Sequence, residues 1–265
     1  MKVAISGGCG SIGFATALEL LNNPNNEVLL LDNSEHSIFV TKSELQKMGL
    51  SGRCKVRFAD VREEAPMLRH FQGYDLVFHC AALKHVPLCE EESNEAFKTN
   101  VMGTHNAIKA AEMNNCKFLL MSTDKAVGSS VMGQTKYNAE KDTLSQGHTA
   151  IRSGNALGSR GCFFDAAIEQ IESGLCVKIT DVKMDRYIIH LDDLARFIVR
   201  VMKVMGNKIY IPIMEEVNVF NYLQARGMKE NYELIGARKG EVLKEKLFYG
   251  SEHRELKDWC WEVTK

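Results

Sequence analysis

The chain has 265 residues, of which 45% are hydrophobic and 25% charged, and it contains only 4 prolines. This composition is ordinary for one globular domain, with or without a smaller lobe, and it excludes a fibrous, low-complexity or disordered protein. With 33 basic against 34 acidic residues, the formal net charge of -1 gives no electrostatic reason to expect nucleic acid or an anionic membrane as a partner.

Short apolar segments bounded by polar or glycine-rich turns recur along the first part of the chain, and we predict them to be strands buried on both faces. Helical patterns separate them; in the last one, Val101, Thr104 and Ile108 fall on one stripe. This alternation predicts a parallel, doubly wound α/β sheet of the Rossmann type. The predicted strands are Val3–Ser6, Val28–Leu31, Lys55–Ala59, Leu76–Cys80, Phe118–Met121 and Thr149–Arg152, and the predicted helices are Ala15–Leu21, Ile38–Met48 and Val101–Met113.

After Asn155 the alternation loosens, and the tail mixes polar helix-like stretches with short apolar pieces. We predict a Rossmann domain over residues 1–154, to which residues 186–207 return, and a smaller C-terminal substrate-binding lobe made of residues 155–185 and 208–265. No apolar run approaches the ~20 residues needed to cross a bilayer. Because a strand-like segment follows Met1 almost at once, in place of a signal peptide, we expect a cytoplasmic protein with no membrane span.

The 8 cysteines are scattered along the chain. They form no C-x-x-C motif and no Cys/His cluster with the spacing of zinc ligands. We therefore expect neither a metal nor a disulfide.

A glycine-rich segment, Gly7-Gly8-Cys9-Gly10-Ser11-Ile12-Gly13, follows the first predicted strand and opens the first predicted helix. The glycines permit a tight turn and let the backbone approach a pyrophosphate, while the helix N-terminus offers unpaired N–H groups to that anion. This context is the one that a dinucleotide fingerprint requires. We assign Gly7, Gly10, Ser11, Ile12 and Gly13 to cofactor binding.

Asp32 ends the second predicted strand. Its carboxylate should accept hydrogen bonds from the adenosine ribose and repel a 2'-phosphate, and Asn33–Glu35 supply no cation to reverse that preference, so NAD is favoured over NADP. Further strand ends carry Asp60-Val61 and Ala81-Ala82. We expect Asp60 to bind the adenine amino group, with Val61 beside it, and the small Ala81 and Ala82 to let the backbone lie against the cofactor.

Several motifs in the chain resemble one family. The fifth strand ends in Ser122-Thr123-Asp124-Lys125-Ala126, and M-G-Q-T-K follows at 132–136. Together with H-C-A-A-L-K-H-V-P at 79–87, K-T-N-V-M-G-T at 98–104, R-S-G-N-A-L-G-S-R-G at 152–161, M-D-R-Y at 184–187 and G-A-R-K-G-E at 236–241, these motifs resemble the CapD-like nucleotide-sugar 4,6-dehydratases, a branch of the extended short-chain dehydrogenase/reductases.

The resemblance implies a hydro-lyase acting on UDP-N-acetylglucosamine. Hydride leaves C-4 for NAD, the C-5 proton and the C-6 hydroxyl are lost as water, and hydride returns to C-6. It further implies that Thr123 binds the C-4 oxygen, Asp124 protonates the departing C-6 hydroxyl and Lys125 removes the C-5 proton. To act near neutral pH, Lys125 would need a lowered pKa, which we expect from burial beside Lys136 and the nicotinamide ring.

The remaining assignments also follow from the resemblance. Lys136 should hold the nicotinamide ribose, and Asn100 should brace the active-site backbone on the cofactor side. Arg186 and Arg238 should grip the UDP pyrophosphate, because a planar guanidinium can bind two oxygens at once. The other expected substrate residues are Lys84 and His85 in the sugar pocket, Asn155 as an amide donor, Glu241 at the uridine ribose, and Arg160.

One catalytic position departs from the short-chain dehydrogenase pattern. Met132 stands where the tyrosine of Y-x-x-x-K is expected, and Tyr137 lies one residue beyond Lys136. Met132 cannot take a proton from the C-4 hydroxyl, so Lys136, directly or through Thr123 or a water, is the candidate for that step. A nucleotide-sugar 4-epimerase and a noncatalytic NAD-binding homologue remain as alternatives. UDP-glucose as substrate, the face on which C-5 is reprotonated and the size of an expected homo-oligomer stay open.

Overall fold

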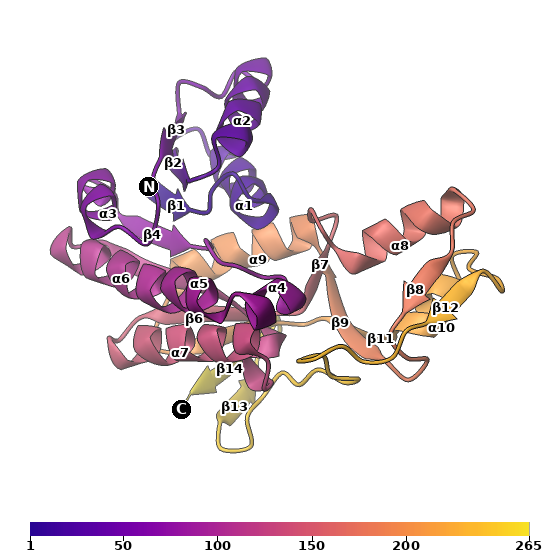
Figure 1. Cartoon of the computed structure of the whole chain (residues 1–265). Helices are drawn as coiled ribbons and strands as arrows, with labels where there is room; N and C mark the ends of the chain where they lie inside the picture. The colour runs from indigo at the N-terminus through magenta and orange to yellow at the C-terminus, as the bar shows by residue number, and fades with distance from the viewer. Residues whose placement is uncertain (265) are drawn as a thin grey trace.

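The computed structural model describes residues 1–264, and a nine-stranded sheet forms the centre of its larger domain (Figure 1). The strand order is β13-β14-β10-β6-β5-β4-β1-β2-β3. All pairs from β3 to β10 are parallel, whereas β14 and β13 are antiparallel to their neighbours, which confirms the predicted doubly wound sheet. The strands are β1 (Lys2–Ser6), β2 (Glu27–Asp32), β3 (Cys54–Phe58), β4 (Leu76–His79), β5 (Lys117–Thr123), β6 (Thr149–Ser153), β10 (Ile209–Pro212), β13 (His253–Leu256) and β14 (Cys260–Thr264).

Helices cover both faces of this sheet, so alternate residues of one strand enter different cores. Val3 and Ile5 of β1 pack into the core beneath α1 (Ser11–Leu21), α2 (Glu35–Lys47) and α9 (Leu191–Val204). Ala4, between them, packs into the core beneath α3 (Glu64–Phe71), α6 (Gly103–Met113) and α7 (Val131–Ser145). Burial on both faces explains why the central strands are almost continuously apolar. Within residues 1–264, no helix combines the length and the apolar character required to cross a membrane.

The smaller lobe has a core of its own, which includes Phe164, Ile179 and Leu223. Its first sheet contains β7 (Asn155–Leu157), β9 (Asp185–His190) and β11 (Glu215–Asn218), and its second pairs β8 (Val177–Ile179) with β12 (Tyr232–Leu234). Helices α8 (Phe163–Glu172) and α10 (Val219–Gln224) complete it. In Figure 1 these elements stand to one side of the large sheet.

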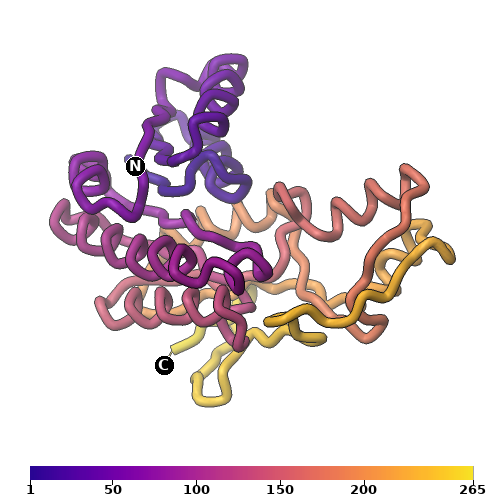
Figure 2. Tube along the Cα trace, in the orientation of Figure 1, coloured from indigo at the N-terminus to yellow at the C-terminus, as the bar shows by residue number. Residues whose placement is uncertain are grey.

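The chain passes between the two units several times, as the change of colour along the tube in Figure 2 shows. It enters the lobe at β7, returns through α9 and β10, enters again at β11 and ends in the large sheet with β13 and β14. The predicted division therefore differs from the structure in two places. Residues 208–265 were assigned to the lobe as a whole, and β9 was expected to return to the main sheet with residues 186–207. Local periodicity does not encode which distant strand a short segment joins. Lys265, the last residue of the predicted lobe, lies outside the described residues.

Candidate functional site

The glycine turn lies at the carboxyl end of β1, where the strand order of the sheet reverses between β1 and β4. Gly7 has a φ of +72°, and a Cβ there would lie 2.6 Å from the backbone nitrogen of Ala81, so only glycine allows this approach. The backbone N–H groups of Cys9 and Ser34 donate to the two oxygens of Asp32 at 3.2 and 3.0 Å. Among the described residues, no side chain caps the N-terminus of α1, whose first turn carries no acidic residue, so its N–H groups can bind an anion.

Asp60 and Val61 follow β3 on the same side of the sheet. Asp60 already binds the Arg62 guanidinium through both oxygens, with Nε to Oδ1 at 3.0 Å and Nη2 to Oδ2 at 2.6 Å. These hydrogen bonds hold the pKa of the Asp60 carboxyl below its usual value. Val61 is buried, and a Cβ on Gly103 would lie 2.7 Å from its Cγ2. An adenine at this strand end would therefore meet a carboxylate that is already paired with a cation.

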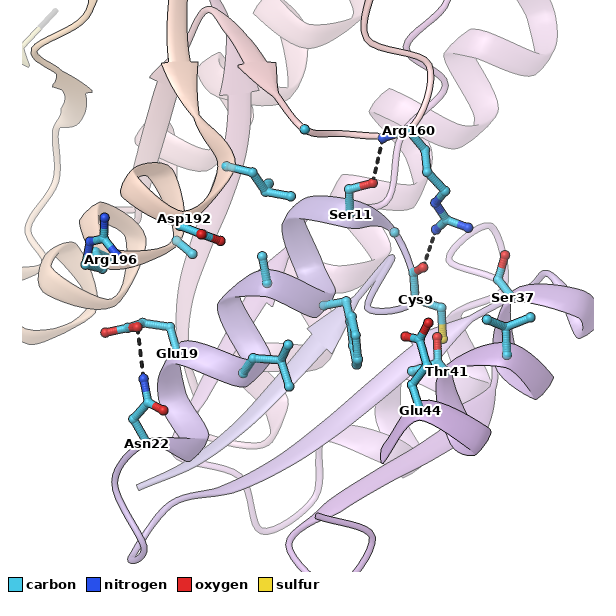
Figure 3. Close-up of a pocket in the computed structure, with 18 residues that line it drawn as sticks. Cys9, Ser11, Glu19, Asn22, Ser37, Thr41, Glu44, Arg160, Asp192 and Arg196 are labelled. Carbon is cyan, nitrogen blue, oxygen red and sulfur yellow. Dashed lines mark hydrogen bonds between the residues drawn. The ribbon is translucent and has the colours of Figure 1, made fainter. Parts of the chain in front are cut away.

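Arg160 connects the lobe to the glycine turn (Figure 3). Its guanidinium donates to the Cys9 carbonyl, its backbone N–H donates to Ser11 Oγ at 2.9 Å, and its own carbonyl accepts from Lys84 Nζ at 2.6 Å. Arg160 lines a groove of about 580 Å³ on the outer face of α1, between α2 and α9, and not the cavity that contains Arg186 and Arg238. Its contacts thus place it between the glycine turn and Lys84.

An inner cavity of about 280 Å³ lies where the carboxyl ends of β4, β5 and β6 face the lobe. It brings together residues that the sequence analysis had assigned separately to cofactor, chemistry and sugar. Among those lining it are Ile12, Ala82, Lys84, His85, Thr123, Lys125, Met132, Lys136 and Asn155.

Thr123 ends β5, and Asp124 and Lys125 begin the following 3₁₀ turn, η2 (Asp124–Val127). One oxygen of Asp124, Oδ1, accepts from Thr123 Oγ1 at 3.0 Å and from Lys125 Nζ at 3.1 Å. Asp124 is fully buried and does not line the cavity, and its other oxygen has no hydrogen-bond partner among residues 1–264. Thr123 and Lys125 therefore stand between the cavity and a buried carboxylate.

The electrostatics at Lys125 correct the expected lowering of its pKa. Burial lowers the pKa, but the nearby carboxylates of Asp124 and Glu245 together outweigh burial and raise the pKa above the usual value for lysine. Glu245 Oε1 lies 3.7 Å from Lys125 Nζ, and its own pKa is raised by burial. Instead, Lys136 has the depressed value: burial lowers its pKa to about 8, while its Nζ donates to the Met121 carbonyl at 2.6 Å.

Met132 is 3% exposed, lines the inner cavity and packs against Cys89 and Ala96. Tyr137, the neighbouring tyrosine in sequence, does not line that cavity; its ring packs at a tilt of 54° against that of Tyr249, with 4.9 Å between centroids. No tyrosine hydroxyl within residues 1–264 lines the inner cavity. Helix α7 therefore presents Met132 and Lys136 to the cavity without a phenol.

Asn100 lies in a π-helical turn, η1 (Lys98–Met102), and braces the loop after β4. Its Oδ1 accepts from the Leu83 N–H at 2.8 Å, and its Nδ2 donates to the Leu83 carbonyl and to Thr135 Oγ1, both at 3.0 Å. The side chain thus joins the loop that carries Ala81 and Ala82 to helix α7.

An outer cavity of about 220 Å³ continues from Lys125 and Asn155 toward Arg186, Arg238 and Glu241. Arg186 is largely committed to the protein: its guanidinium donates to the carbonyls of Asp185, Val242 and Leu243 at 2.8 to 3.1 Å. Arg238 is exposed, and its backbone N–H donates to Glu241 Oε2 at 3.1 Å. Of the two arginines, Arg238 has the freer guanidinium for an external anion.

A buried ion cluster holds the C-terminal segment over the site, and the sequence analysis did not find it. Arg152 donates to both oxygens of Glu140 and to both oxygens of Glu252, with distances of 2.7 to 3.1 Å, and to the Leu247 carbonyl at 2.6 Å. The Tyr249 hydroxyl donates to the Ala126 carbonyl of η2. Through these contacts, residues 245–252 lie against the turn that carries Lys125.

Comparison with known proteins places this chain in a family. The family model described as "Polysaccharide biosynthesis protein" matches residues 3–260. An uncharacterized membrane protein of Methanocaldococcus jannaschii is 35% identical over 97% of this chain and 83% of its own. CapD of Staphylococcus aureus is 33% identical, but the chain spans only 45% of its length. A Campylobacter jejuni protein named UDP-N-acetylglucosamine 4,6-dehydratase (inverting) is 32% identical over 92% and 76%, and a Rickettsia akari protein named UDP-glucose 4-epimerase is 32% identical over 96% and 79%.

Solved structures share the fold along nearly the whole chain. Pen from Bacillus thuringiensis superimposes with a TM-score of 0.92 at 27% identity and covers 98% of this chain and 87% of its own. DesIV from Streptomyces venezuelae, a dTDP-glucose 4,6-dehydratase described with NAD bound, has a TM-score of 0.82 at 21% identity and covers 94% and 89%. The chain belongs to the polysaccharide biosynthesis protein family, in the branch that includes CapD and the UDP-N-acetylglucosamine 4,6-dehydratases.

Proposed function

We propose that the protein is an NAD-dependent nucleotide-sugar 4,6-dehydratase that converts UDP-N-acetylglucosamine to a UDP-4-keto-6-deoxy sugar. One observation carries the proposal: Asp124 Oδ1 bridges Thr123 Oγ1 and Lys125 Nζ, and these two residues line the inner cavity. A hydroxyl, a buried carboxylate and an amine are the groups that the elimination of water next to a ketone requires. A 4-epimerase needs no such acid–base pair, because it removes nothing from C-6.

The residues around the glycine turn fit NAD. The uncapped start of α1 supports binding of the pyrophosphate, and the Asp32 carboxylate supports a free ribose 2'-hydroxyl. Solved structures that share the fold include one described with NAD. When bound, NAD supplies the hydride acceptor for C-4 and the hydride donor for C-6.

The proton of the C-4 hydroxyl needs an acceptor other than Met132. We assign Thr123 as the group in contact with it: Thr123 takes that proton on Oγ1 and passes its own to Asp124, which lies at hydrogen-bond distance. The same path in reverse delivers a proton from Asp124 to the departing C-6 oxygen. The proton lost from C-4 is then the one that leaves in water, so the sequence balances without an outside acid. Lys136, with its lowered pKa, is the second candidate for the C-4 proton.

Lys125 removes the C-5 proton and later returns it, while the nucleotide occupies the outer cavity. Arg238 binds the pyrophosphate with its exposed guanidinium. Arg186 contributes chiefly by fixing residues 242 and 243, of which Val242 lines that cavity. Asn155, whose Nδ2 donates to the Tyr187 carbonyl, stands where the two cavities meet.

Incubation with UDP-N-acetylglucosamine and NAD, followed by mass spectrometry, tests the proposal. We expect a product lighter by one water, with UDP-glucose run in parallel to define the sugar. A product of unchanged mass with inverted C-4 would identify a 4-epimerase, and no conversion with retained ligand binding would identify a noncatalytic homologue. Thr123→Val, which keeps the shape but removes the hydroxyl, should lose C-4 oxidation, whereas oxidation at the parent rate in that variant would leave Lys136 as the acceptor.

A further inference from the structure

Glu245 is a buried carboxylate that the steps above do not use. It is 5% exposed, and its Oε1 lies 3.7 Å from Lys125 Nζ and 3.8 Å from Arg186 Nε. It lines the outer cavity beside Lys125. The charged groups that face it are Lys125, Asp124 and Arg186. A carboxylate in such surroundings is costly to bury unless its charge is matched or it takes up a proton.

The protonation state of Lys125 conflicts with its proposed role as the C-5 base. With Asp124 at 3.1 Å and Glu245 at 3.7 Å, the amine is stabilised as an ammonium, and an ammonium cannot remove the C-5 proton. Near pH 7, a lysine with an ordinary pKa of ~10.4 is neutral in only about one molecule in 2,500. The proton on Lys125 therefore needs an acceptor close to Nζ.

We infer that Glu245 is that acceptor, a positioning residue that holds Lys125 and takes its proton so that the free amine can act at C-5. This inference rests on the proposed dehydratase function. In the step, one N–H bond of the Lys125 ammonium breaks, an O–H bond forms on Glu245, and the electron pair stays on Nζ. Asp124 is the alternative partner of Lys125, but in the proposed sequence it already holds the proton from the C-4 hydroxyl.

The local structure supports this assignment over a purely structural role for Glu245. The segment around Glu245 is fixed without its carboxylate: Arg186 binds the carbonyls of residues 242 and 243, and Arg152 binds that of Leu247. The Glu245 carboxylate faces two cations, Lys125 at 3.7 Å and Arg186 at 3.8 Å. Burial raises its pKa and so makes it a better proton acceptor than an exposed glutamate.

Exchange of the C-5 proton of the UDP-4-keto-6-deoxy product in deuterated water isolates this step, because the exchange needs the base and no hydride transfer. We expect Glu245→Gln to lower the exchange rate by about 10²–10³-fold near neutral pH, because an amide cannot take a proton. Lys125 must then lose its proton to solvent, so the rate in this variant should rise about tenfold per pH unit. In the parent and in Glu245→Asp, where a carboxylate can take the proton, we expect the exchange rate to depend only weakly on pH. Lys246→Gln, at the exposed neighbouring position, should match the parent.

Three results would overturn the inference. Exchange in Glu245→Gln at the parent rate or faster would show that the carboxylate only raises the pKa of Lys125. A slow rate with unchanged pH dependence would indicate a structural effect. If the Gln variant does not fold, the Asp variant keeps the inference testable, because exchange in Glu245→Asp that rose tenfold per pH unit would show that a carboxylate at this position does not take the proton. A parent protein that neither dehydrates the sugar nor exchanges its C-5 proton would instead overturn the proposed function, and with it the role of Glu245.

Discussion

Two parts of the site are built in different ways. We call the region around the glycine turn the cofactor half, and the region around Thr123, Asp124 and Lys125, where the proposed elimination would occur, the elimination half. Around the glycine turn, the interacting groups other than Arg160 are close in sequence or stand at the ends of neighbouring strands, as in the contact of Asp32 with the backbone of Cys9. In the elimination half, Lys125 faces Glu245, and Arg152 joins Glu140 to Glu252. Apart from Arg160, short-range contacts therefore fix the cofactor half. The second half depends on ion pairs between segments far apart in the chain, so a substitution there can change both chemistry and stability.

Replacing Lys125 should separate C-4 oxidation from the elimination step most clearly. Lys125→Ala removes the C-5 base but leaves Thr123, Lys136 and the cofactor half in place, so C-4 oxidation should persist. Loss of a positioned base typically lowers the rate ~10²–10⁴-fold. On substrate addition we expect a reduced-nicotinamide absorbance band that persists, with dehydrated product forming slowly. Normal product formation, or C-5 exchange at the parent rate, would return Lys125 to a structural role.

Replacing Arg152 tests how far the elimination half depends on its buried ion cluster. Arg152→Met leaves Glu140 and Glu252 buried without their cation, and breaking a buried pair in this way costs about 3–5 kcal/mol. Urea unfolding should show that loss in the free energy of unfolding. The exposed pair of Arg196 with Asp193 provides the control, since Arg196→Met should change stability by less than about 1 kcal/mol.

The pH dependence of the Arg152→Met variant gives an independent check. The unpaired carboxylates should bind protons in the folded protein, so folding takes up protons and the stability of the variant should fall as the pH rises. Its deficit relative to the parent should thus be smaller near about pH 5 than near about pH 8. An equal deficit at both values would mean that lost packing, and not uncompensated charge, explains the destabilisation.

The same contrast explains what the sequence could predict. The strands around Val3, Val28 and Leu76 were found because burial on both faces leaves a continuous apolar run, and the turn at Gly7 because its chemistry is local. Glu245 gave no such signal: a glutamate in a polar tail becomes part of the site only when β13 and β14 return to the large sheet. Glu245 is one of the two carboxylates that raise the pKa of Lys125. Because the sequence gives no sign that Glu245 lies beside Lys125, the predicted lowering of that pKa has the wrong direction.

Cofactor choice is the smallest effect that we expect, and it tests the locally built half. Both oxygens of Asp32 accept backbone N–H groups, so the carboxylate is held at the end of β2, where a 2'-phosphate would meet its charge. A hydrogen bond to a charged group is worth about 1.5–3 kcal/mol, which corresponds to roughly tenfold to hundredfold tighter binding of NAD than of NADP by calorimetric titration. Asp32→Asn should narrow that ratio, whereas Glu35→Gln, at an exposed carboxylate three positions on, should leave it unchanged. Tighter binding of NADP by the parent would show that a cation from elsewhere in the fold, such as Arg62 beside Asp60, attracts the 2'-phosphate more strongly than Asp32 repels it. The cofactor half would then depend on long-range contacts as much as the elimination half does.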